Sequence, residues 1–411
     1  MTKAVATKTE KHYFFEKIIL NTLLSLPLGR LNITLPSGKI HKAGNGDGSI
    51  EANINIISSD FYLKGILYGD IGFAEAYIDG DWETDDIKNV IRFFILNLEY
   101  TSFMSGGKVK QLSINTLRWV NKMYNNAREN TFAGSKKNIA VHYDLGNAFY
   151  ELWLDKTMTY SGAYFSATDM SLEEAQFQKY DRLCRQLNLK TSDNVLEIGT
   201  GWGANAIHIA KYYGCRVDTY TISEAQYKYA LLKVENEGLS HKINVFFKDY
   251  REIEGKYSKI VSIEMLEAVG AKYYHTFFAK CDSLLSKNGM LGLQVITCPD
   301  SRFEQIKSNV DFIQKHIFPG SVIPSVSAIN NAINGTSDLT MVDLKAFGLD
   351  YAKTVSLWQQ KFDENLDAIG KLGFSEKFIR KWKYYLSYCE AAFDMKNINV
   401  MQLIYAKPNH F

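Results

Sequence analysis

The stretch that decides the fold runs from Val195 to Ala230 and reads VLEIGTGWGANAIHIAKYYGCRVDTYTISEAQYKYA. A short apolar run, Val195–Glu197, is followed by a glycine-rich turn and then by a helical pattern over Ala204–Tyr213. A second apolar run, Arg216–Ile222, follows closely enough to form the next parallel strand of a βαβ unit. The order strand, turn, helix, strand therefore predicts an α/β sheet with a ligand site at the carboxyl ends of its strands.

Three glycines form this turn, Gly199, Gly201 and Gly203. Without a Cβ atom the backbone can bend sharply and let a ligand approach closely. The turn by itself fits either a nicotinamide dinucleotide or S-adenosylmethionine. A dinucleotide site needs an acidic residue near the end of the second strand to hold the ribose hydroxyls, and this chain has Thr221 there, which disfavours that ligand.

Further stretches follow one another in a fixed order: VHYDLGNAFYELWLDKTMTYSGAYF (141–165), VLEIGTGWG (195–203), TISEAQ (221–226), KDYRE (248–252), EMLEAVG (264–270), DFIQKHIFPGSVIPS (311–325) and AFGLDY (346–351). Together they resemble the cyclopropane fatty acid synthases, a branch of the class I S-adenosylmethionine-dependent methyltransferases. The closing stretch over 372–393 is more similar to the plant-type and related bacterial branch.

The resemblance implies an α/β fold with two domains. A Rossmann-like catalytic domain with an open, mostly parallel seven-stranded sheet is expected over residues 131–411. A smaller α+β amino-terminal accessory domain is expected over residues 1–130, where RLNITL and ANINIIS read as short strands and the following residues to about 80 as helix and turn. That domain either contacts lipid or a second copy of the chain, or is a plain accessory domain.

The resemblance also implies a set of residues around S-adenosylmethionine. Those expected to contact it are Tyr160, Ser161, Gly199, Gly201, Gly203, Thr221, Gln226, Asp249 and Tyr250. Two alternatives stay open: Tyr160 packs over the sheet edge, or Asp249 is a loop acid whose hydrogen bonds are satisfied within the chain.

Cyclopropane formation leaves a carbocation on the acyl chain, from which a base must remove a proton. In the family this base is a bicarbonate ion, and the resemblance implies that Glu267, Tyr351, Gln294 and the backbone near Ile296 and Gly162 hold it. Two positions depart from the common pattern: Gly162 stands in place of a cysteine and Gln294 in place of a histidine, the latter as in the plant-type branch. Glu264, three residues before Glu267, is expected to point elsewhere.

Composition excludes several other classes of protein. The net charge is +2, with 47 basic and 45 acidic residues, which disfavours a nucleic-acid-binding protein. The five cysteines are scattered and form no C-x-x-C pair, so neither disulfides nor a zinc site is expected, and no metal site is predicted. These features favour a reducing, cytoplasmic setting. No apolar run is long enough to cross a membrane, and FFEKIILNTLLSL (14–26) predicts an amphipathic helix that docks either on the protein or on a membrane surface.

The sequence therefore predicts an enzyme that transfers a methylene group from S-adenosylmethionine to unsaturated acyl chains of phospholipids. It is expected at the inner membrane surface as a peripheral protein, with a homodimer as a possible assembly. The departure at Gln294 keeps open a methyl-branched or methylene product, and the departures at Gly162 and Gln294 together suggest the last of the following alternatives. Another small-molecule methyltransferase and a catalytically silent lipid-binding paralogue are the remaining alternatives.

Overall fold

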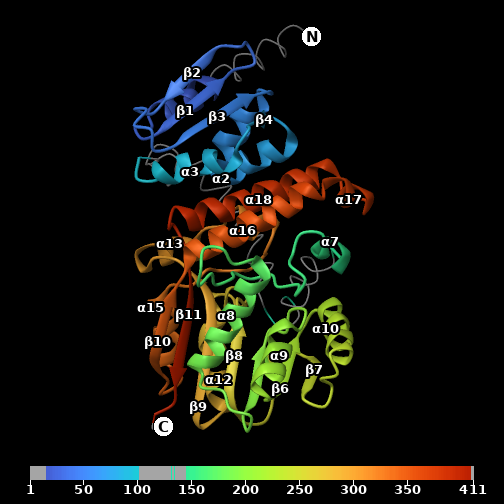
Figure 1. Ribbon diagram of the computed structural model, residues 1–411. Coiled ribbons are helices and arrows are strands. Elements are labelled where there is room, and N and C mark those ends of the chain that lie inside the picture. Colours follow the sequence, from blue (N-terminus) through green and yellow to red (C-terminus); the bar gives the residue numbers. More distant parts are fainter. Residues whose placement is uncertain (1–14, 101–130, 132–133, 135–144, 409–411) are drawn as a thin grey trace. The chain divides into compact units, whose positions relative to one another are not determined.

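The computed structural model describes residues 15–100, 131, 134 and 145–408, and these form two compact units (Figure 1). The first unit contains the described residues up to 100 together with Asn309–Lys315 and Leu366–Asn397. The second contains the rest. The catalytic unit is thus not the continuous segment 131–411 that was expected, because two later segments belong to the first unit. The boundary expected near residue 130 lies outside the described residues.

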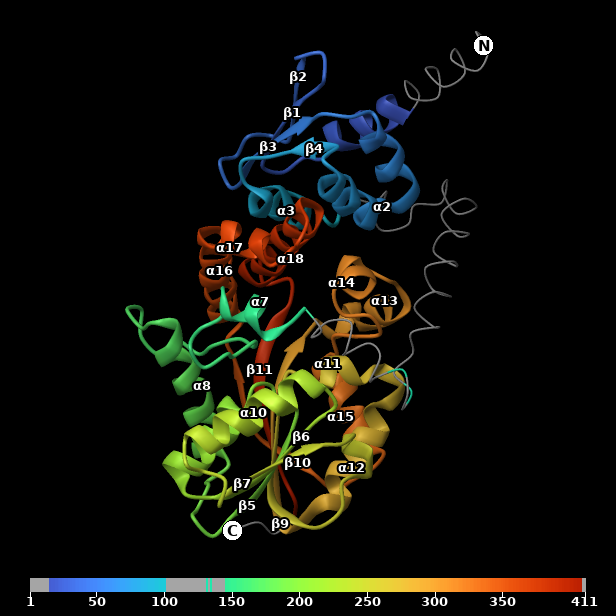
Figure 2. The same cartoon turned by 90° about the vertical axis from the view of Figure 1, so that its right-hand side faces the viewer.

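The second unit is built on a seven-stranded sheet (Figure 2). Its strands, in spatial order, are β10 (Thr340–Ala346), β11 (Asn399–Ala406), β9 (Leu285–Thr297), β8 (Tyr257–Ile263), β5 (Asn194–Ile198), β6 (Arg216–Thr221) and β7 (Ile243–Phe247). Strand β11 runs opposite to the other six strands, which all point in the same direction. The predicted open, mostly parallel, Rossmann-like sheet is confirmed.

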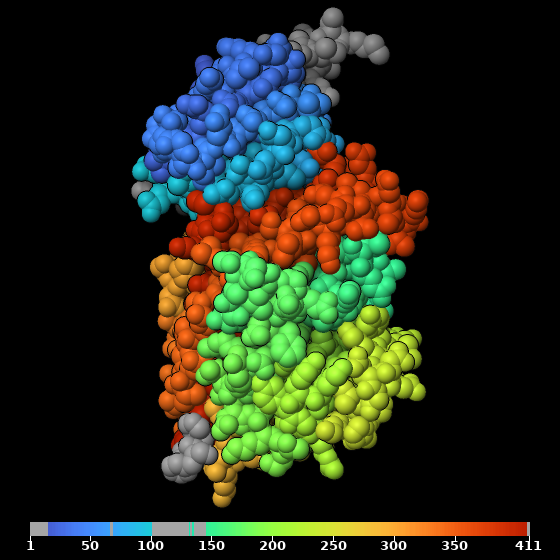
Figure 3. All heavy atoms as spheres, in the orientation of Figure 1, coloured from blue at the N-terminus to red at the C-terminus, as the bar shows by residue number. Residues whose placement is uncertain are grey.

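Helices cover both faces of this sheet, and alternate strand residues point to each. Val195 packs with α8 (Leu172–Gln186), α9 (Ala204–His208) and the following π-helical turn Ile209–Tyr213. Its neighbour Leu196 packs on the opposite face with α12 (Tyr274–Leu284) and α15 (Val326–Asn334). In Figure 1 helix α8 lies in front of strands of this sheet, and in Figure 3 the green segment forms part of the surface on that side. This period-two burial is the reason that a continuous apolar run forms a central strand.

The remaining helices connect these layers. They are α7 (Asn147–Glu151), α10 (Glu224–Asn236), α11 (Leu266–Val269), α13 (Phe303–Ser308) and α16 (Gly348–Glu364). Helix α14 (Phe312–His316) lies almost wholly in the segment Asn309–Lys315 of the first unit. Single 3-10 turns occur at Tyr250–Glu252, Ala271–Tyr273 and Asp300–Arg302.

The first unit has its own four-stranded sheet, in the order β2 (Ile40–Ala43), β1 (Arg30–Thr34), β3 (Glu51–Ile56) and β4 (Trp82–Glu83). Helices α2 (Asp60–Asp79), α3 (Ile87–Leu96), α17 (Leu366–Lys371) and α18 (Glu376–Asp394) complete it. The two predicted strands and the helix after them are present. The expected amphipathic helix is helical over 15–24, and its Ile19, Leu20 and Leu23 are buried, so its described part packs on the protein.

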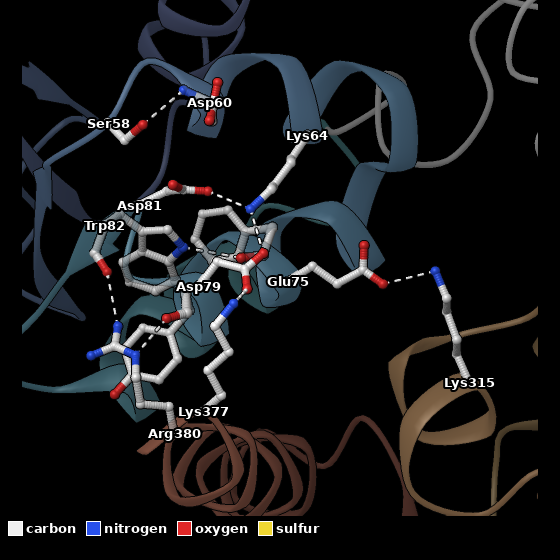
Figure 4. Close-up of polar contacts among 12 residues, drawn as sticks. Ser58, Asp60, Lys64, Glu75, Asp79, Asp81, Trp82, Lys315, Lys377 and Arg380 are labelled. Carbon is white, nitrogen blue, oxygen red and sulfur yellow. Dashed lines mark hydrogen bonds and ion pairs between the residues drawn. The ribbon is translucent and has the colours of Figure 1, made fainter. Parts of the chain in front are cut away.

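Charged side chains explain why two distant segments belong to this unit (Figure 4). On α18, the Arg380 guanidinium donates to Tyr77 O at 2.7 Å, Glu83 Oε1 at 2.7 Å and Trp82 O at 3.3 Å. Lys377 pairs with Asp79 at 2.7 Å, although it is largely exposed. Lys315, from the other late segment, pairs with Glu75 at 2.7 Å.

Within the part of the chain that the structure describes, no helix combines the length and the apolar character needed to span a membrane.

Candidate active site

The glycine turn lies between β5 and α9, and its three glycines have φ values of 101°, 53° and 88°. Glu197, at the end of β5, supports this turn because it is buried and accepts hydrogen bonds from Asn205 Nδ2 at 2.7 Å and Thr219 Oγ1 at 2.5 Å. Burial raises the pKa of Glu197 to about 7. A Cβ at Gly199 would lie 3.3 Å from the Met265 side chain, so the turn contacts the EMLEAVG segment closely.

The other residues expected around S-adenosylmethionine are held by local hydrogen bonds. Thr221 Oγ1 donates to Gln226 Oε1 at 3.0 Å, which fixes the orientation of that amide at the start of α10. Asp249 accepts two hydrogen bonds from the Arg251 guanidinium, each 2.8 Å long, as the loop-acid alternative expects. Tyr250 is partly buried and its ring contacts Phe277, with centroids 5.5 Å apart.

Aromatic rings surround Tyr160, which is itself partly buried. Its ring centroid lies 5.3 Å from that of Trp153, 5.4 Å from that of Trp358 and 5.7 Å from that of Tyr150. The Tyr351 ring extends this cluster through an edge contact with Trp358. Both expected roles of Tyr160, packing and ligand contact, fit such a position.

Next to this cluster, three donors from separate segments bind the Glu264 carboxylate. The Gly162 amide donates to Oε1 at 2.9 Å and the Gln294 side-chain amide donates to the same oxygen at 2.8 Å. The Tyr351 hydroxyl donates to Oε2 at 2.6 Å. Of the expected catalytic residues, Gly162, Gln294 and Tyr351 are therefore brought together, around an acid that was not expected.

Gly162 acts here through its backbone alone. Its carbonyl oxygen accepts from Gln294 Nε2 at 2.9 Å, in addition to the bond that its N–H donates. A Cβ at this position would lie 2.7 Å from a ring carbon of Tyr351, which is closer than real Cβ contacts. The Tyr351 ring thus fills the space that a side chain at position 162 would need.

Glu267 lies in the first turn of α11, three residues after Glu264. Its Oε1 accepts from the Ile296 amide at 2.5 Å, while its Oε2 is buried without a hydrogen-bond partner. Burial and, secondarily, the negative charge of Glu264 raise the pKa of Glu267 to about 8. Ile296 supplies a backbone amide as expected, and in the structure that amide binds Glu267.

The expectation that Glu264 points away from the site is wrong. The residue follows the last residue of β8 and has φ of 50°, in the left-handed region. Its amide donates to Gln294 O at 2.7 Å, which holds this turn in place. The strand alternation on which the expectation relied therefore ends one residue earlier, and the carboxylate points into the site.

Two further residues were missed from the sequence. Lys179, on α8, is fully buried and donates to Ser161 Oγ at 2.6 Å. Burial lowers its pKa to about 7, while the negative charge of Glu264 acts in the opposite direction. Gln402, on β11, donates to Gln294 Oε1 at 3.1 Å and so orients the Gln294 amide toward Glu264. Lys179 falls on the core-facing stripe of α8, which is the signal that could have revealed it.

The donors assigned to bicarbonate by the resemblance thus bind a carboxylate of the chain itself. The Glu264 carboxylate accepts the hydrogen bonds of Gly162, Gln294 and Tyr351. The Glu267 carboxylate accepts that of the Ile296 amide. These residues do not fit a separate anion as well. Among the described residues, no cluster of His, Cys, Asp or Glu suited to a metal ion occurs, and all five cysteines are free thiols.

Comparison with known proteins agrees with this fold. The family model described as mycolic acid cyclopropane synthetase matches residues 131–403. The chain is 34% identical over 348 residues to tuberculostearic acid methyltransferase UfaA1 of Mycobacterium tuberculosis, covering 82% of this chain and 78% of that protein. It is also 34% identical over 369 residues to the cyclopropane-fatty-acyl-phospholipid synthase of Escherichia coli, covering 88% and 89% of the two chains.

Among solved structures, mycolic acid cyclopropane synthase CmaA1, complexed with SAH and CTAB, superposes with a TM-score of 0.62. The two sequences are 29% identical, and the match covers 66% of this chain and 98% of that chain. The sheet order, the glycine turn and these similarities lead to one assignment. The chain belongs to the mycolic acid cyclopropane synthetase family of S-adenosylmethionine-dependent methyltransferases.

Proposed function

We propose that this enzyme transfers a methylene group from S-adenosylmethionine to the cis double bond of an unsaturated acyl chain of a phospholipid, forming a cyclopropane ring. The observation that carries the proposal is the pair of carboxyl groups, Glu264 and Glu267, next to the glycine turn and an aromatic cluster. Ring closure requires a base that takes a proton from carbon in a site that excludes water. Methyl transfer to the nitrogen or oxygen of a small molecule does not require this arrangement.

The glycine turn fits S-adenosylmethionine because its positive φ values leave a bend without side chains. Gly199, Gly201 and Gly203 would hold this group together with Tyr160, Ser161, Thr221, Gln226, Asp249 and Tyr250. When bound, it supplies an electrophilic methyl group to the alkene, which leaves positive charge on the acyl chain. Lys179 fixes the side chain of Ser161 in this region through its 2.6 Å hydrogen bond.

The aromatic cluster is suited to positive charge on an acyl chain. Ring faces attract a cation most strongly where water is excluded. The ring centroid of Tyr160 lies 5.3 Å from that of Trp153 and 5.4 Å from that of Trp358. The centroids of the two tryptophans are 5.8 Å apart. These side chains would delay capture of the cation by water until a proton leaves.

A methyl-branched or methylene fatty acid is the second candidate product. Two relatives are equally similar to this chain, and their names differ: one is a tuberculostearic acid methyltransferase and the other a cyclopropane-fatty-acyl-phospholipid synthase. The first name favours this second candidate. In this alternative the cation rearranges by hydride shift, and loss of a proton then leaves a methylene or an unsaturated methyl-branched chain. A saturated methyl branch needs a hydride donor in addition to the same cofactor and acyl chain.

The setting of the reaction is also part of the proposal. The substrate is a membrane phospholipid, so we place the enzyme at the cytoplasmic surface of the inner membrane as a peripheral protein. The amino-terminal accessory domain expected over 1–130 contacts lipid or a second copy of the chain in a homodimer. Flotation with phospholipid vesicles and light scattering at several protein concentrations test these two contacts.

The activity is tested with methyl-labelled S-adenosylmethionine and liposomes of monounsaturated phospholipid, followed by mass spectrometry of the fatty acids. The expected product is one labelled methylene heavier, gives ring fragments and resists alkene hydrogenation. A labelled branched or methylene chain supports the second candidate. Absence of lipid label despite calorimetric binding of S-adenosylmethionine contradicts both and favours another acceptor or a silent paralogue.

Two variants make this assay specific to the site. Glu267→Ala removes the carboxyl group beside Glu264 and is expected to abolish the labelled lipid. Glu237→Ala is the matched control, because Glu237 is an exposed acid paired with Lys211 at 2.8 Å, away from the glycine turn and both site acids.

A further inference from the structure

The Glu264 carboxylate is bound in the way that an enzyme binds a small oxyanion. It accepts one backbone N–H, one side-chain amide and one phenolic hydroxyl, from residues 162, 294 and 351. These donors come from three separate segments, and their distances lie between 2.6 and 2.9 Å. Such convergence around a single carboxylate is typical of a preorganised charge site.

The two acids of this site have different surroundings. Glu264 has three donors, and the positive charge of Lys179 also favours its ionised form. Glu267 has one backbone donor for Oε1 and none for Oε2, and its pKa is raised to about 8. Although burial raises the pKa of Glu264 too, its donors oppose that rise. Glu264 therefore has more groups that favour its ionised form than Glu267 has, an asymmetry of the kind that acid–base sites use.

A second anion at this position would be disfavoured. The amide and hydroxyl donors that could bind it are engaged with Glu264, and its charge would lie beside that carboxylate in a partly buried site. Like charges that are close together and removed from water repel strongly. Bicarbonate would thus need both to displace Glu264 and to take its donors.

We propose that the Glu264 carboxylate is itself the base that removes the proton from the transferred methyl group, in place of bicarbonate. This inference rests on the proposed cyclopropane-forming function. In the step, a C–H bond of the new methyl group breaks, its electron pair forms the second C–C bond of the ring, and the proton moves to a carboxylate oxygen of Glu264. The cation is thereby neutralised, Glu264 becomes neutral, and loss of its proton to solvent after product release restores the base.

The backbone offers a sharp variant for the test. Because Glu264 has φ of 50°, glycine fits this position with less strain than any other residue. Glu264→Gly removes the carboxylate and leaves its three donors facing a space that a small anion can fill. Glu264→Gln keeps the shape of the side chain without a basic oxygen, and it guards against a loss of activity that is caused by the change in packing.

The first measurement is turnover in carbon dioxide-free buffer, with and without added bicarbonate. We expect the unmodified enzyme to be equally active in both, and both variants to lose at least 100-fold, as removal of a general base does. Added bicarbonate or formate should raise the turnover of Glu264→Gly at least tenfold and leave the turnover of Glu264→Gln unchanged. A tenfold stimulation of the unmodified enzyme by bicarbonate, or full activity of Glu264→Gln, overturns the proposal.

The second measurement is independent of turnover. Infrared difference spectra with carbon-13 bicarbonate, in the presence of S-adenosylhomocysteine, report whether the ion binds. We expect a bound signal in Glu264→Gly and none in the unmodified enzyme, and the reverse result contradicts the assignment. If the unmodified enzyme labels no lipid, the proposed function fails, while this spectrum still decides whether Glu264 occupies the anion position.

Discussion

The ring of Tyr351 lies directly against the α-carbon of Gly162, so that a Cβ there would meet a ring carbon at 2.7 Å. The same tyrosine donates its hydroxyl proton to Glu264 at 2.6 Å. The absence of a side chain at position 162 therefore sets the position of the hydroxyl that binds Glu264.

Gly162→Ala is expected to lower turnover at least tenfold, because the new methyl group pushes the Tyr351 ring away from Glu264. Overpacking of this kind costs about 1–3 kcal/mol of stability, which thermal unfolding will report. Gly370→Ala is the control, since a Cβ at that glycine meets nothing within 4 Å. Equal activity of the two variants would show that the Tyr351 ring moves aside freely.

Tyr351→Phe keeps the ring and removes only the hydroxyl. A hydrogen bond to a charged group contributes about 1.5–3 kcal/mol, so kcat is expected to fall roughly 10- to 100-fold. The Tyr351 hydrogen bond lowers the pKa of Glu264, and its loss raises that pKa. The acid limb of the pH–rate profile should therefore move to higher pH.

The matched control for this variant is Tyr213→Phe, which removes a 2.7 Å hydrogen bond to Asp181 away from the site. It should leave the acid limb in place. A lower kcat for Tyr351→Phe with an unmoved acid limb would mean that the hydroxyl positions substrate and does not tune Glu264.

The buried Glu267 predicts a pH-dependent stability. Its pKa is about 8 in the folded protein and 4.5 as the ordinary value, so between these pH values the folded state binds more protons than the unfolded state. The free energy of unfolding should then fall as pH rises through this window. Urea unfolding at several pH values will show a shallower fall for Glu267→Gln than for the unmodified enzyme. Parallel curves for the two proteins would contradict the raised pKa.

Arg380 and Lys377 lie on the same helix but differ in burial. The Arg380 guanidinium makes hydrogen bonds to Tyr77, Trp82 and Glu83 and stacks 4.1 Å from the centroid of the Tyr77 ring. Arg380→Ala should lower the free energy of unfolding by about 2–4 kcal/mol, because the backbone carbonyls of the buried residues Tyr77 and Trp82 lose a charged donor. Lys377→Ala removes an exposed ion pair and should cost less than about 1 kcal/mol. Equal losses by denaturant titration would refute this ranking.

Much of the fold and part of the site follow from local sequence. The run Val195–Glu197 and the glycines after it specify strand, turn and helix because each local preference agrees with the others. Gly162, Gln294, Tyr351 and Glu267 could be named through motif resemblance. That the two late segments, 309–315 and 366–397, join the first unit could not be predicted, because the residues they contact are more than 200 positions away in the sequence.

Glu264 and Lys179 show why the rest of the site was not predictable. The position of Glu264 depends on one left-handed backbone residue, which strand periodicity does not register. Lys179 is charged, and lysine is almost always exposed unless it has a partner. Its partners, Ser161 and the charge of Glu264, are brought near it only by the tertiary fold.

The chain order of the catalytic sheet has a consequence for synthesis on the ribosome. β11 is inserted between β9 and β10, and it follows α18 in the sequence. A nascent chain that has completed β10 still lacks the neighbour to which that strand is hydrogen-bonded. It also lacks Gln402, which orients the Gln294 amide. The hydrogen-bonded arrangement around Glu264 is consequently incomplete until β11 has been synthesised and has left the exit tunnel.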